Sequence, residues 1–243
     1  MDSLQDTWVY LSASPLFHLT LTLAAFQLAS ALFEKMGRNP LLNPVLGAVL
    51  VVVAVLVLTE TDYGTYFEGA QFVHFLLGPA TVALAVPLYR QWQRVRRSAL
   101  AIAVSLLAGS LTAILSAVLV AWLLGGSEPV LASLAPKSVT APVAMGIAEK
   151  LGGLPSLTAV LVIVTGILGA MLGPKVLDLM GVVDWRARGL AIGTASHGIG
   201  TARALQVNET AGAFSGLAMG LNALATALLL PMIWGGVVWL LGS

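Results

Sequence analysis

Long apolar runs alternate with short polar breaks along most of the chain. The runs predict membrane-spanning helices at Pro15–Phe33, Leu41–Leu58, Ala70–Tyr89, Ser98–Leu124, Pro155–Leu172 and Ala213–Leu241. Most are near the roughly 20 residues that an α-helix needs to cross a hydrocarbon core of about 30 Å. Gly78-Pro79 interrupts the third run, and Pro231 lies inside the last. We therefore expect a break in the third helix and a tilt or kink in the last.

Two further segments are too polar for a lipid-facing helix. Leu131–Lys150 contains Pro136-Lys-Ser-Val-Thr-Ala-Pro142, and Gly189–Arg203 contains glycines, hydroxyl residues, a histidine and an arginine. Backbone groups at membrane depth must be satisfied within the protein, so a broken helix persists there only if it is buried or lines a wet cavity. Both segments are predicted to be discontinuous or re-entrant.

The composition supports the same picture. The 243 residues are 58% hydrophobic and 9% charged, whereas about a quarter of residues are charged in soluble domains. The fold class predicted is an all-α polytopic membrane protein with about seven to eight transmembrane segments in a single domain, residues 1–243. The net charge is +1 and no basic tail suggests nucleic acid. Without any cysteine, disulfides, thiolate metal sites and a cysteine nucleophile are excluded.

The loop charges predict the topology. Arginines are concentrated in the loop Arg90–Arg97, whereas the loop Thr59–Glu68 is acidic and has no lysine or arginine. Because basic loops stay inside, Arg90–Arg97 should be cytoplasmic and Thr59–Glu68 external. This topology places the N-terminus outside. Asp184–Arg188 is expected to lie along the cytoplasmic surface.

Internal similarity suggests an inverted repeat. Gly78–Leu84 matches Gly200–Leu205, and Val120–Gly125 matches Val237–Gly242. The predicted topology gives the two units, 41–125 and 131–243, opposite orientations. Interrupted helices in inverted halves are typical of secondary transporters, with the substrate near the membrane midplane, and we expect an elevator-like architecture. The alternative is a chance match between two alanine-rich apolar stretches.

Two cations are candidates to bind a carboxylate. Arg203 follows two glycines in an interrupted segment, and a guanidinium can hold a carboxylate with two hydrogen bonds. Lys137 lies between Pro136 and Ser138, where breaks also provide helix N-termini that favour anions. In the alternatives, Lys137 extends to the outer interface, and Arg203 pairs with Glu209 or caps a helix C-terminus.

Several polar side chains are further candidate substrate ligands. They are Ser138, Thr140, Thr194, Ser196, Thr201 and Asn43. Asn43 precedes Pro44 at the start of a predicted helix, so capping is its favoured role and lining the substrate path the alternative. The breaks that carry the others place them where they could face a carboxylate or hydroxyl oxygen.

His197 is the candidate for proton coupling, because a histidine titrates near neutral pH. A structural hydrogen bond to a carbonyl freed by Gly198 and Gly200 is the slightly favoured alternative. The three histidines show no metal-ligand spacing, so neither a metal nor another cofactor is predicted. Ser196-His197 has no nearby aspartate to complete a hydrolytic triad, and no dinucleotide or P-loop motif is present. We therefore expect no enzyme.

Several long motifs resemble the LrgB/CidB family of bacterial inner-membrane proteins. They are Pro136–Ala144, Ala191–Ala204, Gly152–Val160, Gly212–Met219, Asn43–Val45 and Phe75–Tyr89, and the resemblance covers nearly the whole chain. It implies a multi-pass protein of the bacterial inner membrane, related to the plastid glycolate/glycerate transporter of plants. It also implies the antiholin-like label, linked to control of murein hydrolase activity and cell lysis, and a small LrgA/CidA-type holin-like partner.

Two functions are therefore expected as alternatives. The first is secondary transport of small monocarboxylates such as glycolate, glycerate, pyruvate or lactate, coupled to protons or sodium. The second is antiholin-like regulation of murein hydrolases and lysis with a holin-like partner. Charged breaks at membrane depth favour transport, because a scaffold that only binds a partner does not need them. A homodimer embedded in membrane lipid is the expected assembly.

Overall fold

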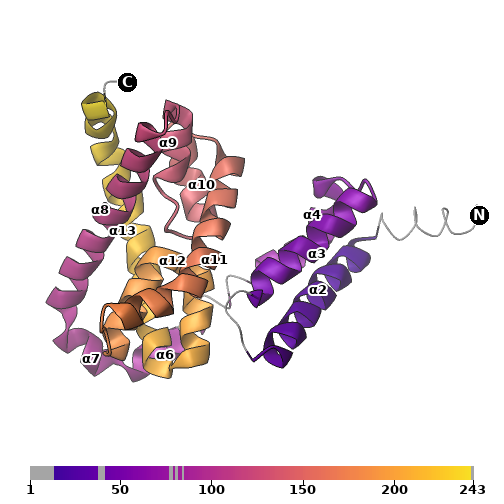
Figure 1. Ribbon diagram of the computed structural model, residues 1–243, viewed down its shortest axis with the longest axis horizontal. Helices are drawn as coiled ribbons and strands as arrows, with labels where there is room; N and C mark the ends of the chain where they lie inside the picture. The colour runs from indigo at the N-terminus through magenta and orange to yellow at the C-terminus, as the bar shows by residue number, and fades with distance from the viewer. Residues whose placement is uncertain (1–13, 38–41, 77–78, 80–81, 84, 242–243) are drawn as a thin grey trace, which may run out of the picture. The chain divides into compact units, whose positions relative to one another are not determined.

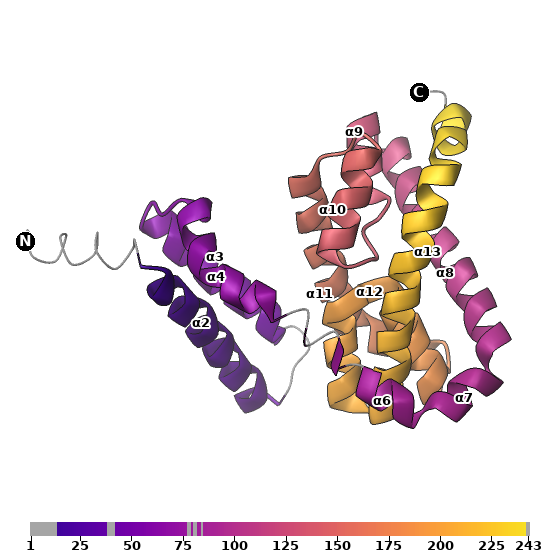
Figure 2. The same ribbon diagram turned by 180° about the vertical axis from the view of Figure 1, so that it is seen from behind.

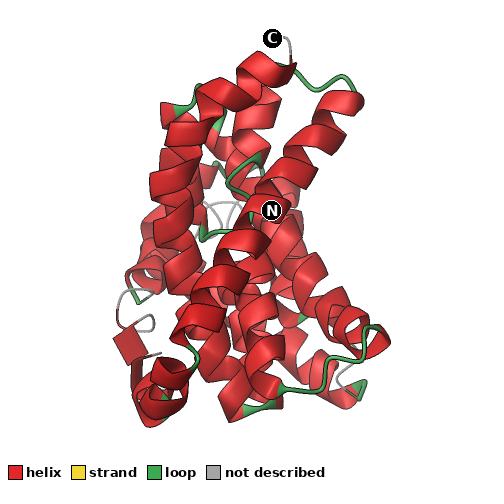
Figure 3. Cartoon of the chain, turned by 90° about the vertical axis from the view of Figure 1, so that its left-hand side faces the viewer, coloured by secondary structure: helices red, strands yellow, loops and turns green. Residues whose placement is uncertain are grey.

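The computed structural model describes residues 14–37, 42–76, 79, 82–83 and 85–241. Within these ranges the chain forms helices joined by loops and turns, and no strand (Figure 3). The chain divides into two compact units, Met1–Ala83 and Leu84–Ser243, which are described separately. The all-helical class is thus confirmed. The repeat units 41–125 and 131–243 stay a prediction, since Gly78 and much of the segment around it lie outside the described residues.

Among its described residues, the first unit packs three helices, α2 (Pro15–Lys35), α3 (Pro44–Leu58) and α4 (Tyr63–Phe75) (Figure 1). Glycines allow close packing against α2, because a Cβ on Gly47 would lie 2.9 Å from the Ala29 Cβ. α4 begins at Tyr63, so the expected loop Thr59–Glu68 is wrong in its second half. Asp62 explains this start, since its Oδ2 accepts hydrogen bonds from the first N–H groups of the helix.

The second unit contains eight labelled helices among its described residues. They are α6 (Ala85–Arg90), α7 (Trp92–Arg97), α8 (Ala99–Leu123), α9 (Glu128–Leu134), α10 (Ala141–Lys150), α11 (Pro155–Leu179), α12 (Trp185–Val207) and α13 (Glu209–Leu241). The arginine-rich segment Arg90–Arg97 was expected to be a loop, but it is largely helical, in α6 and α7.

A first hairpin is formed by α9, the turn 135–140 and α10. Pro136 lies in the turn and Pro142 in the first turn of α10, and proline cannot supply the backbone donor that a continuous helix would need there. The chain folds back on itself here. Gly153, beyond the end of α10, approaches α9 so closely that a Cβ on it would lie 2.8 Å from the Ser133 backbone nitrogen. Ser133 Oγ also accepts a 2.7 Å hydrogen bond from Leu154 N–H. The predicted break in Leu131–Lys150 is confirmed as this hairpin.

A second hairpin is formed by the two arms of α12, residues 185–196 and 198–207, with its tip at His197. His197 has a φ of 40° and a ψ of −134°, outside the helical region. A Cβ on Gly200 would lie 2.9 Å from Ile192 Cγ2, whereas residues eight apart in a straight helix are about 12 Å apart. The predicted interruption in Gly189–Arg203 is therefore confirmed, and it is a reversal of direction.

The two hairpins enter the second unit from opposite ends. α11 begins beside the first hairpin, at Leu154, and ends beside the second, where Arg188 donates to the Asp178 carboxylate at 2.7 Å. The α9–α10 pair and α12 accordingly lie toward opposite ends of the unit in Figures 1 and 2. Each hairpin is followed by a long helix, α11 or α13, so the unit contains two similar arrangements in opposite orientations.

α13 packs along the first arm of α12 through small residues. Gly189 lies against Ala211 and Gly193 against Ser215, and a Cβ on either glycine would overlap the α13 backbone. Small residues at four-residue spacing let membrane helices approach closely. At the other end, the first hairpin packs through Leu131 and Val139 against α8 and the second half of α13, including Leu230.

Four helices are long and apolar enough to cross a membrane: α2, α8, α11 and α13. α3 is apolar but shorter, with 15 residues. The expected count of seven to eight spans is therefore not confirmed within the described residues. α11 extends beyond the predicted Leu172 to Leu179, and Asp184–Arg188 forms the cap and first turn of α12.

Candidate functional site

The tips of the two hairpins meet beside the middle of α11 and α13. His197 Nε2 lies 2.9 Å from the backbone oxygen of Val162 in α11, and a Cβ on Gly169 would overlap the Ser196 side chain. In α13, the Asn222 Nδ2 donates to the backbone oxygen of Ser138 at 3.3 Å and to that of Thr194 at 3.0 Å. Ser138 and Thr194, which are more than 50 positions apart in the sequence, are thus brought together in one buried region.

A cavity of about 500 Å³ opens between these tips. Lys137 and Ser138 line it from the first hairpin, and Ser196 lines it from the second. Thr165 and Gly169 contribute the wall formed by α11. This volume lies in the range of small-molecule sites. Most of the remaining lining is aliphatic, so the lysine ammonium and a few hydroxyl groups are the polar features that could orient a ligand.

Lys137 is the only cation among the described residues that line this cavity. Its Nζ donates to Ser138 Oγ at 3.3 Å, and in the described part of the chain no carboxylate forms an ion pair with it. A charged side chain away from the membrane surface faces a wet cavity or a partner of opposite charge. The site therefore has the features expected for binding an anion.

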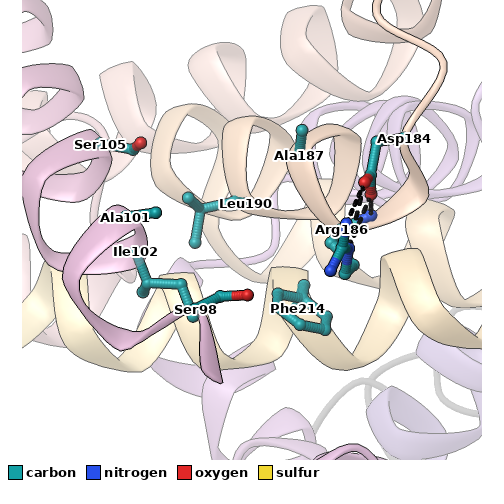
Figure 4. Close-up of a pocket in the computed structure, with 9 residues that line it drawn as sticks. All are labelled: Ser98, Ala101, Ile102, Ser105, Asp184, Arg186, Ala187, Leu190 and Phe214. Atoms are coloured by element: carbon teal, nitrogen blue, oxygen red, sulfur yellow. Dashed lines mark hydrogen bonds and ion pairs between the residues drawn. The ribbon is translucent and has the colours of Figure 1, made fainter. Parts of the chain in front are cut away.

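Two smaller cavities continue from this one along the first arm of α12. A cavity of about 420 Å³ shares Ala191 and Ala195 with it, and this second cavity shares Ala187 and Leu190 with a third, of about 180 Å³. Figure 4 shows the third cavity, with Asp184 and Arg186 paired at one side. Because neighbouring cavities share lining residues, the three lie side by side along the first arm of α12, and we call this row of cavities the groove along α12.

The other predicted ligands lie at different positions. Thr194 lines the middle cavity, and its hydroxyl donates to the Leu190 carbonyl. Thr201 is buried and bonds to the His197 carbonyl and to Ser215 Oγ. Thr140 occupies the N-cap position of α10 without a side-chain capping hydrogen bond, and it lines none of the three cavities.

Arg203 and Asn43 do not line these three cavities either. Arg203 lies on the second arm of α12, where its guanidinium donates to Gln206 Oε1 at 3.3 Å. Glu209, its alternative partner, forms an ion pair with Arg90 at 3.4 Å. Asn43 accepts hydrogen bonds from Val45 and Leu46 N–H, which confirms its capping role.

Asn222 and Thr165 were missed by the reasoning from sequence. Asn222 is the only carboxamide in the long apolar stretch Ala213–Leu241, and that isolation is the signal that could have identified it. Thr165 has no such signal in its run of aliphatic residues. Among the described residues, no group of three histidine, aspartate or glutamate side chains could hold a metal ion.

The comparison with known protein families decides the assignment. The model of the LrgB-like family matches residues 22–235. The chain belongs to the LrgB-like family. The resemblance seen in the sequence motifs is thereby confirmed.

LrgB-like relatives match this chain over most of their length. The protein YxaC of Bacillus subtilis is 38% identical, covering 91% of this chain and 94% of the relative. The holin-like protein CidB of Staphylococcus aureus strain Mu50 is 33% identical, covering 90% and 95%. The holin-like protein CidB of Staphylococcus epidermidis strain RP62A is 32% identical, covering 88% and 93%. No solved structure matches this LrgB-like chain.

Proposed function

We propose that this protein is a non-enzymatic carrier of small monocarboxylates across the bacterial inner membrane. The observation that carries the proposal is Lys137, a cation without a carboxylate partner in the described chain, lining a cavity between the tips of two opposed hairpins. A carboxylate would neutralise the ammonium and accept hydrogen bonds from Lys137, Ser138 and Ser196. The aliphatic remainder of the cavity would contact the short carbon chain.

The arrangement of the hairpins supports transport over a purely structural role. Broken helices with their tips near the middle of two long helices are the usual framework of solute sites in secondary transporters. A cation at such a tip requires an anion or water, and the groove along α12 provides a route to it. Glycolate, glycerate, pyruvate and lactate are the proposed substrates, proton or sodium coupling the proposed driving force, and a homodimer the proposed assembly.

A second candidate function is regulation of lysis with a small LrgA/CidA-type holin-like partner. It is favoured by a specific observation, because the two staphylococcal relatives are named holin-like protein CidB. Neither name mentions a carboxylate, so the names support this alternative better than they support transport. Carriage of an anion and a holin-like role are also compatible, since each could use the same membrane protein.

Uptake by the purified protein in proteoliposomes tests the proposal. Labelled glycolate, glycerate, pyruvate and lactate would be compared for wild type, Lys137→Gln and Lys137→Arg, with Arg203→Gln as a matched loss of one cation. A charged hydrogen bond contributes about 2 kcal/mol, so we expect about 30-fold weaker apparent affinity in Lys137→Gln. Lys137→Arg should recover part of the apparent affinity that Lys137→Gln loses. Arg203→Gln should lose less affinity than Lys137→Gln.

Three outcomes would contradict the proposal at different levels. If the reconstituted wild type takes up none of the four acids, while deletion of the gene changes lysis, the holin-like alternative is supported and transport is not. If uptake is saturable but equal in wild type and Lys137→Gln, transport stands and Lys137 is not the anion contact. A larger loss in Arg203→Gln than in Lys137→Gln would assign the carboxylate to Arg203.

A further inference from the structure

Among the residues that the structure describes, Asn222 is the one side chain with hydrogen bonds to both hairpin tips. Its Nδ2 group donates to Ser138 in the first hairpin and to Thr194 in the second, at 3.3 and 3.0 Å. The two acceptors are separated in sequence by the whole of α11, and their hairpins enter from opposite ends. A single side-chain amide therefore links both hairpin tips to the same point of α13.

The amide is buried and its bonding is asymmetric. Asn222 is 1% exposed, and its Oδ1 has no hydrogen-bond partner among the described residues. An unsatisfied buried acceptor is costly, so a residue that served only to fill space here would be better replaced by an aliphatic one. The donor side alone fixes the orientation of the amide, which makes its two bonds to the tips the feature that the asparagine provides.

The same bonds reach the residues that line the anion cavity. The Ser138 carbonyl is held by Asn222, while the Ser138 hydroxyl accepts from Lys137 Nζ. Thr194 lies two positions before Ser196, which lines the opposite side of the cavity. One turn further along α13, Thr226 bonds instead to Ser110 of α8 at 3.3 Å and has no assigned bond to either tip. Thr226 is thus a matched buried polar residue outside this arrangement.

We propose that Asn222 is a positioning residue that holds the two hairpin tips together around the anion cavity and thereby sets the affinity for the carboxylate. The second part of this inference, the effect on carboxylate affinity, rests on the proposed function. Displacement of either tip from α13 must break one of the two bonds. Release of Asn222 from one tip is accordingly part of any movement that opens the cavity between them.

Hydrogen exchange of the full-length protein in lipid nanodiscs tests the structural part. Asn222→Asp keeps the shape but places an oxygen against the two carbonyls, and Asn222→Ser shortens the side chain without adding charge. We expect amide exchange at least 10-fold faster in residues 135–142 and 193–200 in both variants. Thr226→Val should leave exchange in both segments unchanged. Unchanged exchange at either tip in a folded Asn222 variant would overturn the proposal.

Glycolate uptake in proteoliposomes tests the functional part. We expect Asn222→Ser to raise KM about 10-fold with a smaller change in the maximal rate, and Thr226→Val to leave KM unchanged. Faster exchange at both tips with an unchanged KM would overturn the link to affinity. If wild type transports no glycolate, the proposed function fails, whereas the exchange data still decide whether Asn222 holds the tips. Asn222→Ser keeps both tests possible if Asn222→Asp does not fold.

Discussion

His197 Nε2 lies 2.9 Å from the backbone oxygen of Val162, so the tip of the second hairpin is attached to the middle of α11. His197 is buried and adopts a φ of 40°, a conformation that residues other than glycine rarely occupy. Such a conformation costs of order 1–3 kcal/mol and persists only when surrounding contacts enforce it. The bond to Val162 is one of these contacts, which gives His197 a structural role at the reversal of the chain.

Substitutions at His197 should separate the hydrogen bond from the backbone strain. His197→Ala removes the bond and keeps the strain, whereas His197→Gly removes both. We expect His197→Ala to lower stability by about 2 kcal/mol and His197→Gly by less. Thermal unfolding of the purified variants in detergent measures this order. Equal losses would mean that the positive φ is not a source of strain.

The pH dependence of transport gives a second test of the same residue. If His197 has only the structural role, a His197→Gln variant that folds should keep the wild-type pH profile of uptake. Loss of a titration step in the variant would instead support the proton-coupling role that the sequence suggested.

Gly166 should be intolerant of a side chain. A Cβ there would lie 2.7 Å from His197 Cε1 and 2.8 Å from His197 Nε2, so the ring would have to move and its bond to Val162 would lengthen. We expect Gly166→Ala to lower the free energy of unfolding by about 1–3 kcal/mol. Gly220→Ala in α13 is the matched control, because a Cβ at that position would meet no atom within 4 Å. The control should be neutral or slightly stabilising, because alanine favours the helix; similar melting temperatures for both variants would contradict the expectation.

The breaks in the helices could be predicted from sequence, but their geometry could not. Pro136 and Pro142 flank a polar segment, and proline prevents a continuous helix, so the first break followed from local chemistry. At the second break, glycines surround His197, yet the reversal occurs at the histidine itself. That choice depends on Gly166 and Val162 in another helix, which no local pattern contains.

The same distinction applies to the site. Lys137, Ser138 and Ser196 were predicted because they lie in the breaks, and the structure places all three at one cavity. Arg203 lies in the same predicted segment but on the second arm, and it could be separated from them only when the chain reversal was known. Asn222 is in a regular helix, where its importance comes from the two carbonyls that happen to face it.

Cysteine labelling can test the groove along α12, since the natural chain has no cysteine. Single cysteines at Ala187, Ala191 and Ala195 should react with a water-soluble thiol reagent, because these residues line the adjoining cavities. Cysteines at Val164 and Leu228 are controls that are exposed but line none of these cavities. We expect little labelling at the controls, where lipid should exclude the reagent, and slower labelling at Ala195 when glycolate is present.

Two results would count against a hydrated groove. Equal labelling at Ala191 and at the controls would indicate that the reagent does not distinguish the groove from the lipid-facing surface. Absence of labelling at all three alanines in a folded protein would indicate that the groove is covered and provides no aqueous route to Lys137.

Asp184 should make the start of α12 sensitive to acid. Its Oδ1 accepts from the Arg186 N–H at 2.7 Å, and Arg186 Nε lies 3.1 Å from both carboxylate oxygens. The hydrogen bond from the Arg186 side chain, followed by that from its backbone, lowers the pKa of Asp184 to about 2. Because the pKa is lower in the folded protein than the usual value near 3.9, the ionised carboxylate stabilises the fold above about pH 4. This stabilisation is lost as the pH falls through about 2.

Asp184→Asn and Asp184→Ala separate the charge from the helix cap. Asparagine keeps a side-chain oxygen that can cap α12, so Asp184→Asn removes only the charge, whereas Asp184→Ala removes both and should cost about 1 kcal/mol more. Melting temperatures measured from pH 7 to pH 2 should show the difference between wild type and Asp184→Asn shrinking toward pH 2. The difference between Asp184→Asn and Asp184→Ala should stay constant, because neither side chain titrates. A gap between wild type and Asp184→Asn that is independent of pH would show that the ion pair with Arg186 contributes nothing to stability, leaving the cap alone to fix the start of the second hairpin.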